Sequence, residues 1–183
     1  ATFADLASVT AYLDGFIGST PAPGGGGTTG SGVEAWVYKN SDYTSSARLT
    51  LPSNNFNEVI VSNNVDIVLK TAATDAHDGN KFVFAEDDVV EVKVNLKIDG
   101  NTNSNLMRVK LRSKDGNYAM RQSHADTNVQ QFGQDITFEF SALNINAGTA
   151  ANGFDITVSD FISNADAFIY NIFFTIKKVG TKV

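Results

Sequence analysis

The residues that could do chemistry are few, and one short segment holds several of them. Ser123, His124 and Asp126 supply the residue types of a nucleophile, a base and an acid, whereas the second histidine, His77, precedes an Asp-Gly-Asn turn. A catalytic triad needs side chains that point at one another, which residues so close in sequence rarely do. The sequence also lacks the G-x-S-x-G, H-E-x-x-H and P-loop motifs. We therefore expect a polar loop at residues 123–126 and no enzymatic activity.

Two acidic segments offer oxygen ligands of the kind that Ca²⁺ prefers. Glu86, Asp87 and Asp88 are consecutive, and Asp99 opens the segment DGNTNSN. Both segments end predicted strands, where Asp and Asn commonly form turns. The chain has no cysteine, which excludes disulfides and thiolate metal sites. We expect no metal ion and no cofactor, with calcium at either acidic segment as the alternative.

The charge of the chain argues against general binding of nucleic acid. Twenty acidic residues outweigh 14 lysines and arginines, so the net charge is −6, whereas nucleic-acid binding favours a basic surface. The outward faces of residues 91–97 and 108–112 nevertheless gather five cations, Lys93, Lys97, Arg108, Lys110 and Arg112. If these strands pair, the cations form one basic patch that could bind an acidic protein or an anionic glycan. An ordinary solvated face is the alternative.

Most of the chain alternates apolar and polar residues with a period of two, which is typical of half-buried strands. Residues 89–98 show the pattern best, and residues 106–112, 136–140 and 154–158 repeat it. Three DGN triplets supply the turn residues that antiparallel strands need. Residues 33–183 are therefore predicted to form an all-β domain, an antiparallel jelly-roll-like sandwich. The sequence contains no run of about 18 apolar residues, so no membrane span is expected.

The last predicted strand is apolar on both faces. In FIYNIFFTI (168–176), one face carries Phe168, Tyr170, Ile172, Phe174 and Ile176, and the other carries Ile169 and Phe173. A strand that is apolar on both sides is covered on both sides. Ile169 and Phe173 are therefore candidate contacts with another subunit, and cover by a loop of the same chain is the alternative.

The N-terminal residues follow a different pattern. Residues 1–17 place Leu6, Val9, Leu13 and Phe16 on a heptad seam that Ile17 widens, which predicts an anchoring or oligomerisation helix. Residues 18–32 contain seven glycines and two prolines, which is typical of a flexible linker.

This plan of anchoring helix, Gly/Pro linker and cysteine-free β-domain ending in an aromatic strand and KKVG resembles structural proteins of tailed-bacteriophage virions. Capsid decoration proteins, head fibres and tail-fibre tips share it. The resemblance implies a homotrimer at the particle surface, bound to the major capsid protein or another virion protein. The alternative is a tail-fibre or receptor-binding module for host-surface glycans, with Trp36, Tyr38, Tyr43 and Tyr118 as sugar platforms. A secreted hydrolase has the least support.

Overall fold

The computed structural model describes residues 33–52, 57–100, 105–115, 119–127, 133–162 and 166–182. Apart from Val33, these residues belong to one unit of the chain, Glu34–Val183. The predicted helix (1–17) and linker (18–32) lie outside the described residues. The predicted seam residues Leu6, Val9, Leu13, Phe16 and Ile17 lie outside them too.

Nearly all of the described elements are strands. They are β1 (Glu34–Asn40), β2 (Leu49–Leu51), β3 (Val59–Ile60), β4 (Val65–Lys70), β5 (Asp88–Gly100), β6 (Asn105–Ser113), β7 (Ala119–Thr127), β8 (Gln134–Asn144), β9 (Phe154–Ile162) and β10 (Ala167–Thr181). A short helix, α2 (Ala147–Asn152), separates β8 from β9 and begins at Asn146, whose side chain accepts a hydrogen bond from the Thr149 N–H group.

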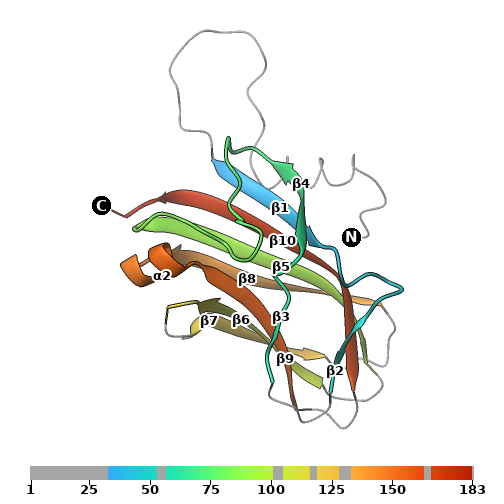
Figure 1. Ribbon diagram of the computed structural model, residues 1–183. Coiled ribbons are helices and arrows are strands. Elements are labelled where there is room, and N and C mark those ends of the chain that lie inside the picture. The colour runs from blue at the N-terminus through green and yellow to red at the C-terminus, as the bar shows by residue number, and fades with distance from the viewer. Residues whose placement is uncertain are drawn as a thin grey trace. The chain divides into compact units, whose positions relative to one another are not determined.

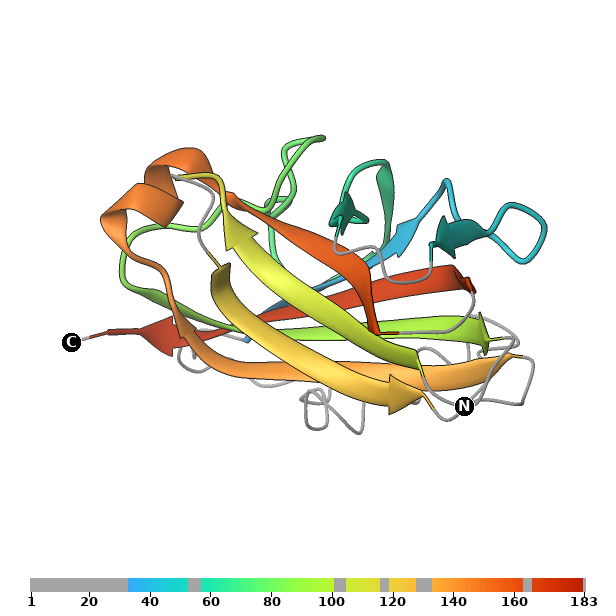
Figure 2. The ribbon, with the colours of Figure 1, turned by 90° about the horizontal axis from the view of Figure 1, so that it is seen from below.

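The strands form two antiparallel sheets that lie in two layers (Figures 1 and 2). The first sheet has the order β4–β1–β10–β5–β8, with β2 also paired to β10, and the second has the order β3–β9–β6–β7. The chain begins in the first sheet with β1 and β2, crosses to β3 in the second sheet and returns with β4 and β5. Strands β6 and β7 then lie in the second sheet, β8 in the first and β9 in the second, and β10 returns to the first sheet, where it pairs with β1. This is the strand order of a jelly roll, and it confirms the predicted fold class.

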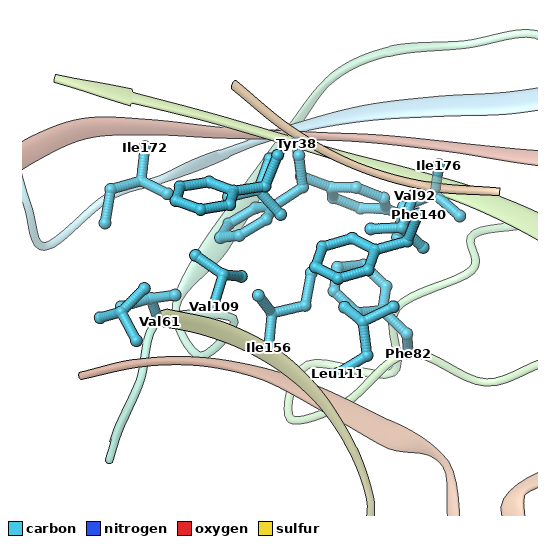
Figure 3. Packing of buried hydrophobic residues seen from close by; sticks show 14 of the residues in the cluster. Tyr38, Val61, Phe82, Val92, Val109, Leu111, Phe140, Ile156, Ile172 and Ile176 are labelled. Carbon is cyan, nitrogen blue, oxygen red and sulfur yellow. The ribbon is translucent and has the colours of Figure 1, made fainter. Parts of the chain in front are cut away.

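The core lies between the two sheets (Figure 3). Strand β5 faces it with Val90, Val92, Val94, Leu96 and Ile98, each at most 2% exposed, because successive side chains of a strand point to opposite faces. Strands β6, β8 and β9 face the core with the alternating positions that the sequence predicts: Met107, Val109, Leu111, Ile136, Phe138, Phe140, Phe154, Ile156 and Val158.

In strand β10, the residues that face the core differ in part from those that the alternating pattern predicts. Its register with β5 shifts between Tyr170 and Phe173, and Asn171 between them has a φ of 49°. This bulge turns Ile169 into the core, where it is 0% exposed, and leaves Tyr170 on the outer face. The prediction of Ile169 as a contact with another subunit was therefore wrong, because the side chain is enclosed within its own chain. Phe173 lies half-buried on the outer face.

The two ends of the sandwich differ in which parts of the chain they hold. At one end, the entry end, β1 begins and β10 runs out, with Glu34 opposite Lys178 and Asp88 opposite Thr181. At the other, the far end, Ala167 lies opposite both Gly100 and Leu51. Figure 1 shows the start of β1 near the C-terminus, and β2 at the opposite end.

Candidate functional site

The five cations that the sequence placed in one basic patch lie on two different sheets. Strand β5 belongs to the first sheet and β6 to the second, so the two strands do not pair and the single patch was wrong. On the first sheet, Lys93 Nζ lies 2.7 Å from Glu139 Oε1, and Lys97 Nζ lies 3.0 Å from Asp135 Oδ1. Each of these two lysines has its own carboxylate partner on β8.

The three cations of β6 share a carboxylate that sequence reasoning missed. Arg112 Nη1 lies 3.0 Å from Glu58 Oε2, Arg108 Nη2 lies 3.7 Å from Glu58 Oε1, and Lys110 Nζ forms a close ion pair with Oε1. The Thr157 hydroxyl donates to Oε2 at 3.2 Å. We call Glu58, Arg108, Lys110, Arg112 and Thr157 the Glu58 cluster. Nothing in the sequence around Glu58 marks it as the partner of a strand some fifty residues away.

The sheet order explains how the Glu58 cluster forms. Val158 of β9 lies opposite Val59 on one side and Val109 on the other, so β9 separates Glu58 from the cations of β6. Two strand spacings amount to about 10 Å, a distance that long basic side chains and a glutamate can span together. Thr157 and Ser159, the outward residues of β9, are small and only 1% exposed. They leave room for the long side chains that cross them.

Electrostatics keep Glu58 ionised. Burial by itself raises the pKa of the Glu58 carboxyl, but the hydrogen bond and charge of Lys110, with the charge of Arg112, outweigh it and lower that pKa below its usual range. One carboxylate thus holds three cations, and all four charged side chains are at most 30% exposed. The cluster therefore ties the very short strand β3 to the rest of the second sheet.

A second buried carboxylate, Asp99, joins several segments near the far end. Asp99 is 3% exposed. Its Oδ1 accepts hydrogen bonds from the Gly133 N–H group and, at 3.2 Å, from the Tyr170 hydroxyl, while Oδ2 pairs with Arg48. The Arg48 guanidinium also lies 4.5 Å above the centre of the Tyr170 ring, a cation–π arrangement. Burial and the nearby charge of Asp99 raise the pKa of Tyr170.

In the two acidic segments considered for calcium, Asp88 and Asp99 bind groups of the protein itself. Both oxygens of Asp99 are engaged as above. Asp88 Oδ2 accepts from the Ala85 N–H group at 3.0 Å, and its Oδ1 lies 2.7 Å from Lys178 Nζ. Within residues 33–182, wherever the structure describes them, no group of three or more His, Asp or Glu side chains is placed to hold a metal ion.

Of the four aromatic residues proposed as sugar platforms, two are buried in the core and a third is partly buried. Trp36 and Tyr38 are 3% and 1% exposed and belong to the core, so this expectation was wrong for both. The Trp36 indole donates to the Thr74 carbonyl at 2.8 Å. Tyr43 is partly buried against the core, and Tyr118 lies outside the described residues.

The segment with triad residue types is a strand and not the polar loop we expected. Ser123 and His124 are neighbours on β7, so their side chains point to opposite faces of the second sheet. A hydrogen bond between them of the kind that a triad needs is therefore excluded by geometry. In the part of the chain with assigned structure, no helix is long and apolar enough to cross a membrane.

Comparison with known proteins is informative about the fold. No family and no curated protein matches the sequence. Among solved structures, the chain is similar to PRD1 vertex protein P5, with 14% identity and a TM-score of 0.50 over 85% of this chain and all of that one. It is also similar to the Eiger TNF of S. frugiperda, with 10% identity and a TM-score of 0.50 over 82% of this chain and 95% of that one.

A third likeness is to a protein of infectious bursal disease virus strain Gx, with 9% identity and a TM-score of 0.44 over 91% of this chain and 38% of that one. At such low identities, the two likenesses with a TM-score of 0.50 show a shared fold and nothing finer. The protein is a jelly-roll β-sandwich of the kind found in a phage vertex protein.

Proposed function

We propose that this protein is a structural protein of a tailed-phage particle, a capsid decoration protein or head fibre. In this proposal residues 1–17 attach it to the major capsid protein or another virion protein, and the β-sandwich projects outward as part of a homotrimer at the particle surface. The likeness to PRD1 vertex protein P5, which spans that whole chain, supports a virion role for a domain of this size and strand order.

The observation that carries the proposal is that the start of β1 and the described end of β10 lie at the same end of the sandwich. Residues 1–33 join the domain at Glu34, which pairs in register with Lys178 at the entry end. The described C-terminal residues run out at the same end, since Thr181 lies opposite Asp88. The far end, with Arg48, Asp99 and Tyr170, is therefore the end of the domain opposite to Glu34, where the N-terminal segment joins.

The contacts of the charged side chains agree with a structural role. In the Glu58 cluster and at Asp99, the carboxylates bind cations and N–H or hydroxyl groups of their own chain. Such networks stabilise a fold and specify its strand pairing.

The experiment separates attachment from folding. Particles assembled without the protein are incubated with the full chain, with the 33–183 fragment, or with a Leu6→Asp/Leu13→Asp variant, and bound protein is measured after sedimentation. The full chain should bind, whereas the fragment and the variant should remain folded and fail to bind, because charges on the seam cannot be buried unpaired. Ser8→Asp/Ala11→Asp adds the same charge off the seam and should bind normally.

Two results would overturn this proposal. If the 33–183 fragment binds particles as well as the full chain does, attachment does not use residues 1–17. If no form binds particles but the 33–183 fragment binds host cells or a glycan array, the alternative of a receptor-binding module of a tail fibre replaces it.

A further inference from the structure

His77 lies in the connection between β4 and β5, and its ring is enclosed at the entry end of the sandwich. The imidazole is 4.9 Å from the Phe82 ring and 5.9 Å from the Tyr38 ring, measured between ring centres. Residues 77, 82 and 154 form successive antiparallel bridges, His77 with Phe82 and Phe82 with Phe154. Phe82 therefore lies between His77 and the first residue of β9, Phe154.

The hydrogen bonds of His77 define its neutral form. Nδ1 accepts a hydrogen bond from the Gly79 N–H group at 3.1 Å, so the proton of the neutral ring is on Nε2. That Nε2 atom is buried and has no hydrogen-bond partner, and the same is true of Asp155 Oδ1. A buried N–H donor without a hydrogen bond of good geometry marks a place where a proton has an energetic effect.

The charges around the imidazole act in both directions. Asp75 and Asp78 approach it from its own connection and Asp155 from β9, and all three favour a charged ring. Lys114, with Nζ 3.5 Å from Asp155 Oδ2, and Arg112 offset the charge of Asp155. Burial lowers the pKa of His77, and it outweighs both the Ser62 backbone and these carboxylates, which act to raise that pKa. Burial likewise raises the pKa of Asp155.

We propose that His77 is a proton-controlled latch that holds the β4–β5 connection against β9 and is closed when the imidazole is neutral. Protonation places a hydrogen on Nδ1, which can then no longer accept from the Gly79 N–H group. It also puts a charge in a buried position beside the Tyr38 and Phe82 rings, where the charged form is less favourable than in water. This inference concerns the domain itself and holds whatever the domain attaches to.

The direction of the pH effect follows from linkage. A histidine whose pKa is lower in the closed state stabilises that state above the open-state value of about 6.5, and the stabilisation is lost as the pH falls below it. Asp155 has the opposite sign, because a raised carboxyl pKa favours the closed state as the pH falls toward about 3.9. Measurements between pH 7.5 and 5.5 therefore report chiefly on His77, and Asp155→Asn removes the opposing contribution.

Hydrogen exchange in the full-length protein tests the latch. The amides of Gly79, Phe82 and Val83 bond to His77 Nδ1, the Phe154 carbonyl and the Ala76 carbonyl. Their protection, corrected for intrinsic rates, should fall about fivefold between pH 7.5 and 5.5, within the limit of about tenfold per pH unit for one proton. His77→Gln should abolish this pH dependence. His124→Gln, at an exposed position on β7, should leave it intact.

An NMR titration of the His77 ring supplies a readout that does not require a folded variant of His77. Its midpoint should lie below 6.5 and should fall further in Asp155→Asn, because a charge that favours the imidazolium is lost. Asp135→Asn, at the partner of Lys97 on the first sheet, should not move it. Protection that does not change with pH in the wild type, or a His77 midpoint at or above 6.5, would overturn the proposal.

Discussion

Ile169 and Ile172 of β10 are both completely buried in the same core, although residues three apart on a regular strand point to opposite faces. The bulge at Asn171, with its φ of 49°, makes this possible. It also directs the Asn171 N–H group to the Tyr43 carbonyl at 2.9 Å, away from the β5 ladder. One residue in a left-handed conformation therefore decides which face of β10 is core.

The bulge gives a first prediction. Asn171→Gly should keep the stability of the domain within about 0.5 kcal/mol, because glycine also adopts positive φ. Asn171→Val should lower the free energy of unfolding by about 1–2 kcal/mol, since a β-branched residue is strained there. Urea denaturation of both variants measures the difference. A valine variant as stable as wild type would show that β10 is not held in this register.

The Glu58 cluster gives a second prediction. Glu58→Gln should lower the free energy of unfolding by about 1–3 kcal/mol at pH 7, because three largely buried cations lose their shared carboxylate. Glu139→Gln removes a carboxylate that is 62% exposed and pairs with Lys93, and it should cost less than about 1 kcal/mol. Urea titrations of the two matched variants compare the sites.

The effect of Glu58→Gln should also depend on pH with a defined sign. The pKa of Glu58 is lowered in the folded protein, so its contribution is present above the ordinary glutamate value of about 4.3. It is lost as the pH falls through the lower folded value. The gap in stability between wild type and Glu58→Gln should therefore narrow in acid. A gap that is constant from pH 7 to 3.5 would contradict an ionic role for Glu58.

Much of the fold could be predicted because period-two alternation is a local signal. Val90 to Ile98 and Met107 to Leu111 face the core as their sequence indicates. The pairing of strands depends on residues far apart in the sequence. Strands β5 and β6, although consecutive, lie in different sheets, so the cations of the predicted basic patch lie on two sheets. The bulge at Asn171 and the position of Glu58 across β9 from β6 arise from tertiary pairing, which the local sequence does not determine.

Gly153 gives a third prediction. It has a φ of 76°, and a Cβ at this position would lie 2.7 Å from the Phe82 carbonyl oxygen, which belongs to a backbone that cannot easily move. Gly153→Ala should therefore lower the free energy of unfolding by about 1–3 kcal/mol or more. Gly180→Ala is the control, because no atom lies within 4 Å of its added Cβ. Thermal melts that show equal losses for both variants would contradict this account.

The fourth prediction is the trimer. The full-length protein at micromolar concentration should give a light-scattering mass of three times the 19.6 kDa of one chain. The reason is the heptad seam of residues 1–17, which has Leu at a, Val and Phe at d, and Ile17 beside it, and so departs from the pattern of two-stranded coiled coils. Leu6→Asp/Leu13→Asp should lower that mass if the helix holds the trimer together. Phe173→Ser should lower that mass if the outer face of β10 contributes, now that Ile169 is assigned to the core.

The 33–183 fragment separates these two possible sources of self-association, since it keeps Phe173 and lacks the seam. Monomer masses for both the full chain and the fragment would leave docking on a virion partner as the use of the apolar seam, and self-association would be ruled out at these concentrations.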